Sequence, residues 1–167
     1  MLRLRNSESV EGIKIRGGAD FRRRTREALA LLRPLAAFEL IRAHLAVIRQ
    51  GKRSGVQVSA RNPVFTAGTA TWNHSALWYA GAIAHDAFHA KLHRDAKLHN
   101  TANEPSTVAW SGKAAEQACL VFQREVLLAL HAHTAMIAHV EKHEKNPTYQ
   151  GRNHGWGSWL DYRKRWW

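Results

Sequence analysis

The sequence contains a single cysteine, Cys119, among its 167 residues. One thiol cannot form an internal disulfide, and it cannot supply the several thiolates of a multi-cysteine zinc site. Any structural metal in this chain must therefore be held by histidine and carboxylate side chains. We expect Cys119 itself to be a buried packing residue and not a nucleophile, because it stands between Ala118 and Leu120 on an apolar helix.

Long apolar stretches are also missing. No segment reaches the roughly 18 apolar residues of a membrane span, and the basic N-terminus lacks the apolar region of a signal peptide. We therefore expect a soluble protein without its own export signal, located in the cytoplasm at synthesis. With 45% hydrophobic residues in 167, the chain is long enough for one core, so we expect a single domain over residues 1–167.

Acidic residues are scarce, with 13 Asp and Glu against 25 Lys and Arg, which gives a formal net charge of +12. The positive charge is concentrated at residues 21–27, 48–55 and 161–167. Such a surface attracts an acidic partner, nucleic acid or membrane headgroups, and it serves equally well to keep a protein in solution. Nucleic acid stays a possible partner, although no known binding motif for it accompanies the charge.

Hydrophobic periodicity predicts a mixed α and β fold. Extended segments are expected at residues 11–18 and 54–72, the second of them as a small hairpin or ribbon. Helices are expected over the ranges 19–34, 35–51, 76–94 and 113–146. The third of these helices is apolar nearly all round in its first half, which is typical of a central, buried helix. The fourth is expected to continue unbroken to Pro147.

Three titratable residues interrupt the apolar run "YAGAIAHDAFHAKLH" at positions 79–93. On a helix, His85 and His89 lie one turn apart on the same face, close enough for both imidazoles to bind one Zn²⁺ at about 2.0–2.1 Å. Asp86 lies about 100° around the helix, beside such an ion, where a general base for an activated water would stand. This spacing therefore permits a catalytic zinc site.

Histidine pairs with this spacing are not rare in a chain with eleven histidines. The spacing recurs at His89 and His93, and again at His139 and His143. The last pair stands at the charged end of a predicted helix, where cations are favoured without any metal. His85 and His89 follow an apolar stretch and are expected to be buried, so they need partners, either as metal ligands or as hydrogen-bonded core residues.

Glu116 offers a third ligand, 27 residues beyond His89. It lies near the start of the last predicted helix, in "AAEQACLVFQ", where Ala114 and Ala115 would let two helices approach closely. Glu125 is an alternative ligand further along the same helix. In the competing interpretation, Glu116 is only an acidic residue of a first helical turn.

The segments "AHDAFH" and "EQACLVFQ" together resemble the zincin metallopeptidases of the gluzincin type. That family carries His-Glu-x-x-His on one helix and a Glu on a following helix. The resemblance covers about residues 54–145 and implies an α+β, mostly helical domain with a small β-ribbon packed beside the metal-binding helix. It implies that His85, His89 and Glu116 bind zinc and that Asp86 is the general base. The aromatic, basic segment 146–167 would form a C-terminal tail.

The activity implied by this resemblance is hydrolysis of a peptide or protein substrate by a metal-activated water. Asp86 is one methylene shorter than the glutamate of the family pattern, which shortens its reach toward the water. The extended segment before the metal helix would align the peptide by strand addition. Four residues are candidates to bind the substrate or to stabilise the oxyanion: Tyr162, His154, Tyr149 and His93.

Two other interpretations of the sequence remain. The adjacent His85 and Asp86 also resemble the metal-binding pair of the HD-type phosphohydrolases, in which His44 or His74 and Asp95 would complete the site. Alternatively, the histidines are core residues and the chain is a basic, non-enzymatic binding module for an acidic partner or nucleic acid. Metal content distinguishes the three interpretations. The metallopeptidase would hold one zinc ion, the phosphohydrolase two metal ions, and the binding module none.

Overall fold

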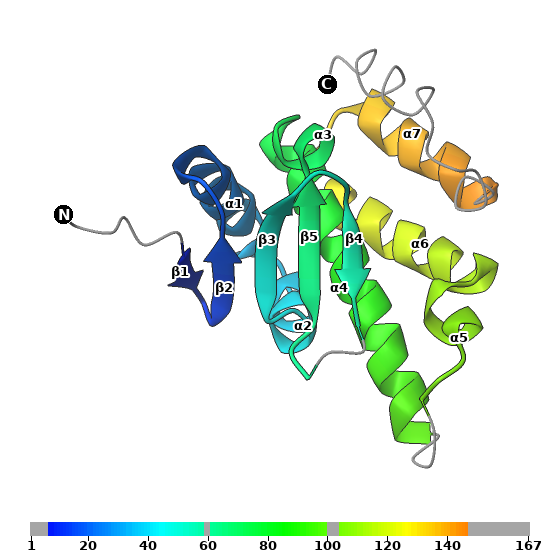
Figure 1. Cartoon of the computed structure of the whole chain (residues 1–167). Coiled ribbons are helices and arrows are strands. Elements are labelled where there is room, and N and C mark those ends of the chain that lie inside the picture. The colour runs from blue at the N-terminus through cyan, green and yellow to red at the C-terminus, as the bar shows by residue number, and fades with distance from the viewer. Residues whose placement is uncertain (1–6, 59–60, 100–103, 147–167) are drawn as a thin grey trace.

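The computed structural model describes residues 7–58, 61–99 and 104–146 (Figure 1). Within these residues a five-stranded mixed sheet is combined with helices, so the fold is α+β, as the sequence predicts. No helix among the described residues is long and apolar enough to cross a membrane.

The sheet has the strand order β1-β2-β3-β5-β4. Its strands are β1 (Ser7–Val10), β2 (Ile13–Arg16), β3 (Val47–Gly51), β4 (Gly55–Gln57) and β5 (Val64–Gly68). The three inner strands are parallel, while β1 and β4 pair antiparallel with their neighbours at the two edges. A two-residue turn joins β1 to β2, and both of its residues, Glu11 and Gly12, have positive φ angles (50° and 86°), as a type I′ hairpin requires.

Helices cover only one face of this sheet (Figure 1). The helices are α1 (Ala19–Leu32), α2 (Ala37–His44), α3 (Thr69–Trp72), α4 (Ala76–His99), α5 (Thr107–Ser111), α6 (Lys113–Ala129) and α7 (Thr134–Lys145). On β2, Ile13 and Ile15 point into the covered side and are fully buried, whereas Lys14 and Arg16 are exposed on the open side. This alternation is the ordinary pattern of a sheet with one solvated face.

The core lies between the sheet and the helices α1, α2 and α4. Fully buried side chains from both layers form it, among them Ile48 and Phe65 from the sheet and Phe21 and Tyr79 from the helices. Tyr79 reaches the hydroxyl group of Thr25 at 2.9 Å, which satisfies both buried hydroxyls. Helix α4 therefore lies at the centre of the molecule, as its apolar first half predicts.

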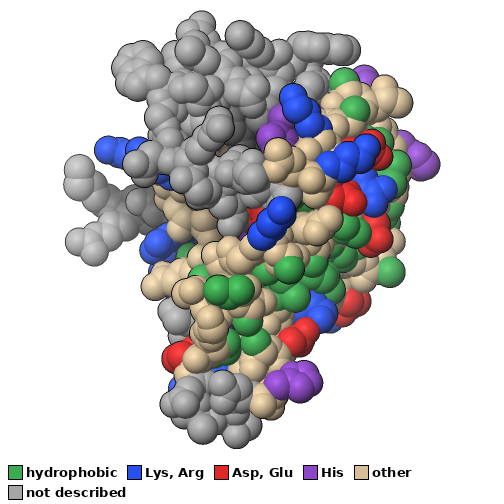
Figure 2. Space-filling view, turned by 90° about the vertical axis from the view of Figure 1, so that its right-hand side faces the viewer, with side chains coloured by type: hydrophobic (Ala, Val, Ile, Leu, Met, Phe, Trp, Pro, Cys, Tyr) green, Lys and Arg blue, Asp and Glu red, His purple; other side chains and the backbone are tan. Residues whose placement is uncertain are grey.

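A second, smaller core holds α6 and α7 against α4. It includes Leu120 and Leu127 of α6 and Met136 of α7. The outer surface of this region carries apolar side chains through its middle, with charged side chains around them (Figure 2). Val108 of α5 is 72% exposed there and Leu128 of α6 is 46% exposed.

The predicted helix over 35–51 is wrong in its second half. Helix α2 ends at His44, Leu45 has extended backbone angles, and residues 47–51 form the inner strand β3. The apolar side chains of Leu45 and Ile48 fit helical spacing, but a short continuous apolar run such as "LAVI" also fits an inner parallel strand. Burial between β2 and β5 decides in favour of the strand.

The predicted ribbon over 54–72 is partly correct. Strands β4 and β5 pair antiparallel, as a hairpin should, with Gly55 opposite Thr66. However, β5 also pairs in parallel with β3, so the ribbon is one edge of the larger sheet. Residues 69–72 form the short helix α3 instead of extended chain, and residues 107–111, which lie between the predicted helices 76–94 and 113–146, form α5.

The single helix predicted over 113–146 is two helices. Helix α6 ends at Ala129, and α7 begins at Thr134. Between them His131 has a positive φ angle of 53°, and the backbone N–H groups of His131 and Ala132 donate to the carbonyls of Leu128 and Leu127. These two bonds form a Schellman motif, which usually requires glycine at the position of His131.

Candidate metal centre

Helix α4 places His85, Asp86 and His89 inside the molecule. Its first half packs into the core, and the two imidazoles emerge one turn apart toward α6. The side chains of His85 and His89 are 14% and 7% exposed, and Asp86 is 9% exposed as a residue. The structure thus buries Asp86 and His89, as their apolar flanks predict, whereas His85 is only partly buried.

Helix α6 brings Glu116 to the same place. Glu116 lies in the first turn of α6 and is fully buried. The two helices approach closely because Gly81 of α4 has no side chain: a Cβ atom at this position would lie 3.1 Å from Leu127 and 3.4 Å from Gln123. Since Gly81 meets the end of α6 and His89 meets its beginning, the helices are antiparallel and bring the motif to Glu116.

The donor atoms of these residues form a compact triangle. The Nε2 atoms of His85 and His89 lie 3.1 Å apart. One carboxylate oxygen of Glu116 lies 3.1 Å from His89 Nε2, and the other lies 3.3 Å from His85 Nε2. For a tetrahedral zinc ion with ligands at about 2.0–2.1 Å, neighbouring ligand atoms stand about 3.3 Å apart. The spacing of the three groups therefore fits a zinc ion.

The backbone of α5 fixes the protonation of His89. The carbonyl oxygen of Trp110 lies 2.6 Å from His89 Nδ1, and a carbonyl can only accept, so Nδ1 must carry a proton. In a neutral imidazole the lone pair is then on Nε2, which faces the Glu116 carboxylate at 3.1 Å. At that distance the Nε2 lone pair and the carboxylate oxygen repel each other unless a cation, either a proton or a metal ion, is bound between them.

The carboxylates and imidazoles perturb one another. Burial raises the pKa of Asp86, and the Glu116 carboxylate raises it further, while His85 and His89 act in the opposite direction. Burial opposes the charged form of His89, yet the pKa of His89 is raised, because the hydrogen bond to Glu116 and the charge of Asp86 favour the cation. The site therefore attracts positive charge.

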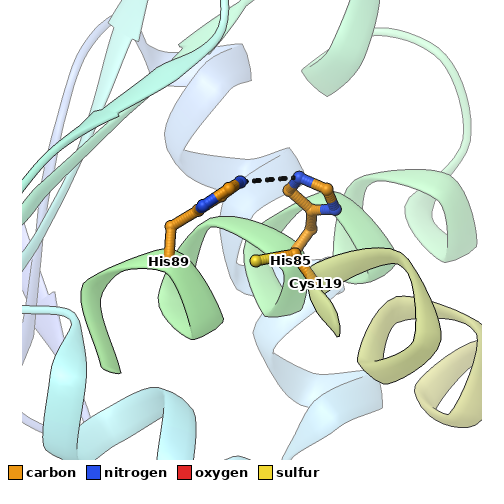
Figure 3. Close-up of side chains that lie close together, drawn as sticks. All are labelled: His85, His89 and Cys119. Carbon is orange, nitrogen blue, oxygen red and sulfur yellow. Dashed lines mark hydrogen bonds between the residues drawn. The ribbon is translucent and has the colours of Figure 1, made fainter. Parts of the chain in front are cut away.

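Cys119 lies beside the two histidines (Figure 3). Its Sγ atom and one nitrogen from each of His85 and His89 lie within 4.8 Å of one another, so these three atoms are also close enough to share a metal ion. Cys119 is fully buried, which agrees with the packing role expected from the sequence. Burial, with the Glu116 and Asp86 carboxylates, raises the pKa of Cys119, so its thiol is protonated at neutral pH.

Two features of the site could not be read from the motif alone. The Trp110 carbonyl is a backbone group near the end of a short helix, so no side-chain pattern marks it; such terminal carbonyls lack an intrahelical partner. The nearness of Cys119 could have been inferred from the sequence, because Cys119 follows Glu116 by three residues and thus shares its helix face.

The other ring nitrogen of His85 has no protein partner in the described part of the chain. Its Nδ1 atom is buried without a hydrogen-bond partner among the described residues.

The other predicted site residues do not join this cluster. His93 is one turn further along α4, with its Nε2 atom 3.3 Å from Glu104 and its ring beside that of Trp110. The alternative ligand Glu125 is exposed on α6. Tyr149, His154 and Tyr162 lie outside the described residues, so their predicted roles stay predictions.

The residues required by the phosphohydrolase interpretation are also apart from the cluster. Asp95 pairs with Lys91 on the outer part of α4, and the ring of His74 packs against that of Trp78. His44 lines a separate cavity, together with Arg94. Among the described residues, none of the three completes a metal-binding group with His85 and Asp86.

A scan against protein-family models and searches of curated proteins and of solved structures find no significant match to this chain.

Proposed function

We propose that this chain is a zinc-dependent metallopeptidase in which His85, His89 and Glu116 hold the metal. One observation carries the proposal: Nδ1 of His89 donates to the Trp110 carbonyl, so Nε2 is the ring nitrogen left to face a buried carboxylate, and the two need a cation with them. Histidine ligands of zinc are oriented in this way by acceptors behind the ring. The near-equal spacing of the three donor groups supports the same assignment.

Asp86 is the general base in this proposal. A zinc ion at the site would lower the pKa of water toward about 7 and polarise the substrate carbonyl. Asp86 would take a proton from the water that attacks the carbonyl carbon and pass it to the amide nitrogen as the C–N bond breaks. Its buried position supports this role, because burial raises its pKa and so makes it a stronger base than an exposed aspartate.

Strand β4 offers a place for the peptide. Among the described strands it is an edge strand that pairs with β5 alone, so the N–H and C=O groups of its other edge would be available to a substrate. An extended peptide can add to such an edge by main-chain hydrogen bonds. Helix α4 packs against β4, which brings the bound chain close to the metal helix.

Metal content of the purified protein tests the proposal. Wild type should contain about one zinc ion per chain, and His85→Ala, His89→Ala and Glu116→Gln should each lose most of it. His139→Ala and His143→Ala are matched controls, because they form a pair with the same spacing on α7 and should retain the metal. Equal metal loss from both pairs would exclude the assignment, and two metals per chain would favour the phosphohydrolase interpretation.

A basic binding module is the second candidate function. The open face of the sheet carries Lys14, Arg16 and Arg49, which are exposed and line one shallow depression. A folded wild-type protein that contains no metal and binds nucleic acid or an acidic protein through these residues would support this function over the peptidase. Arg16→Gln and Arg49→Gln should then weaken that binding and make it less dependent on salt concentration.

A further inference from the structure

A basic cavity lies beside the second half of α4. Its volume is about 640 Å³, and it is lined by the connection between α2 and β3, by Val58, by residues 61–63 and by α4. Six of its described lining residues are basic: Arg42, His44, Arg61, His93, Arg94 and Lys97. Among the described lining residues, Glu11 is the one that is acidic. The volume is within the range of small-molecule sites and exceeds the space that a bare carboxylate needs.

The positive charge of this cavity is only partly neutralised by the protein. Arg42 pairs with Glu39 at 2.7 Å, but neither Arg61 nor Arg94 forms an ion pair among the described residues. The guanidinium of Arg94 has only a long contact of 3.5 Å with the carbonyl of Ala43. The pKa of His44 is lowered by burial and next by the charge of Arg94, while the Asp95 carboxylate acts in the opposite direction.

The cavity lies one helical turn from the candidate metal centre along α4. His93 lines it and lies one turn beyond His89, about 6 Å along the helix axis. Trp110 contacts both residues, since its carbonyl accepts from His89 and its ring packs edge-on against His93 at 5.8 Å. Val58, one residue past the end of β4, forms part of the opposite wall. A peptide lying along β4 would therefore pass from the metal helix toward these cations.

Glu104 shows that these cations accept a carboxylate. It is exposed, and its two oxygens lie 2.5 Å from Lys97 Nζ and 3.3 Å from His93 Nε2. Lys97 and His93 are therefore paired at the rim of the cavity, whereas Arg61 and Arg94 remain for a ligand. Arginine is suited to this role, because its planar guanidinium binds a carboxylate through two parallel hydrogen bonds.

We propose that this cavity is a subsite for a substrate carboxylate, bound by Arg61 and Arg94, and that it selects acidic peptides. The inference rests on the proposed peptidase function for the identity of the substrate. The carboxylate has two possible sources, an Asp or Glu side chain and the C-terminus of the peptide. The binding of the carboxylate itself requires neither metal nor hydrolysis, so it can be measured separately.

A titration with small carboxylates tests the subsite directly. The probes are acetyl-aspartate amide, acetyl-alanine with a free carboxylate and the uncharged acetyl-asparagine amide, followed by NMR of the His44 and His93 rings. At least one carboxylate probe should shift both rings saturably, and the uncharged probe should not. Arg61→Gln and Arg94→Gln should each weaken binding by about tenfold, the worth of one charge-assisted hydrogen-bonded pair.

Two further variants make this result specific. Glu104→Gln removes the carboxylate at the rim and should strengthen binding of the probe, since Lys97 and His93 lose their acidic partner. Arg23→Gln on the exposed surface of α1 removes the same charge elsewhere and should leave binding unchanged. Equal affinity for the charged and uncharged probes, or equal weakening by Arg23→Gln and Arg94→Gln, would overturn the subsite.

Peptide hydrolysis identifies the source of the carboxylate. One peptide set carries internal Asp or Glu with an amidated C-terminus, and the other is neutral except for a free C-terminus. Wild type should prefer one set over fully neutral peptides in kcat/KM, and Arg94→Gln should reduce that ratio by about tenfold. Hydrolysis without any such preference would overturn the subsite alone. Saturable carboxylate binding without any hydrolysis would overturn the peptidase function and leave the subsite standing.

Discussion

Asp86 is the residue at which metal binding and chemistry can be separated. Asp86→Asn keeps the size and the hydrogen-bonding shape of the side chain but removes the proton acceptor. If Asp86 is the general base, the variant should retain zinc, while peptide hydrolysis should fall by about 10²–10⁴-fold, the usual contribution of a positioned base. Zinc content and kcat/KM, measured on the same preparation, provide the test.

Asp86→Glu is the matched control for this experiment. It keeps the charge and adds the methylene that His-Glu-x-x-His enzymes have, so hydrolysis should be retained or increased. Loss of zinc from Asp86→Asn would show instead that Asp86 is a ligand, as the phosphohydrolase interpretation requires.

Cys119 should be inert although it lies beside the histidines. Because its thiol is fully buried and its pKa is raised, we expect a thiol reagent to label it slowly in the native protein and rapidly in urea. Cys119→Ala should cost about 1 kcal/mol of folding stability through the lost packing and should retain zinc. If this variant lost as much zinc as Glu116→Gln, Cys119 would be the third ligand.

At the level of elements, the turn between α6 and α7 has a residue of the wrong type for its backbone. His131 has a left-handed conformation that glycine adopts without strain. His131→Gly should therefore raise the free energy of unfolding by about 0.5–1 kcal/mol, and His131→Val should lower it by about 1–2 kcal/mol. Urea unfolding midpoints of the three proteins measure both effects.

His133 provides the control for that pair of variants. It is exposed in the same turn but has an ordinary φ angle of −54°, so His133→Val should change stability by less than about 0.5 kcal/mol. Similar losses from His131→Val and His133→Val would mean that the backbone angle at His131 is not the cause.

The same turn explains why one helix was predicted where two exist. The hydrogen bonds of His131 and Ala132 end α6, but the sequence there contains none of the usual signals, Gly, Asn or Pro. The apolar contact between Ala132 and Leu127 in the second core stabilises the turn instead. Tertiary packing therefore sets the end of α6 without a local sequence signal. The same holds at β3, where pairing with neighbouring strands makes an apolar run extended.

The site was more predictable than these boundaries, because its residues depend on helical spacing and burial. His85 and His89 had to share a face of α4, and the small residues around Glu116 indicated a close helix contact. The position of the cavity could not be predicted, since residues from α2, from 61–63 and from α4 meet there only in the folded chain. Its charge was visible in the sequence only as scattered basic residues.

At the scale of the whole molecule, the candidate metal centre lies where α4 packs against α6. Its histidines come from α4, which packs on the sheet, and its carboxylate comes from α6, which belongs with α7 to the second core. Glu116 is fully buried, and a buried carboxylate is destabilising unless a cation compensates it. Metal at this position should therefore stabilise the fold as well as supply chemistry.

Chelation should accordingly lower the thermal stability of the whole protein. An ion that binds only the folded state at 100 times its Kd contributes about 2.7 kcal/mol, which corresponds to a change in Tm of about 5–10 °C for a domain of this size. Thermal unfolding of wild type should shift downward by this amount when EDTA is added and return when zinc is restored in excess. Glu116→Gln should show no shift with EDTA, whereas His139→Ala should show the full one. The control is that the wild-type protein contains zinc before EDTA is added and none afterwards. If its Tm is then unchanged, the metal does not stabilise the fold, and the hydrolysis assays alone test its catalytic role.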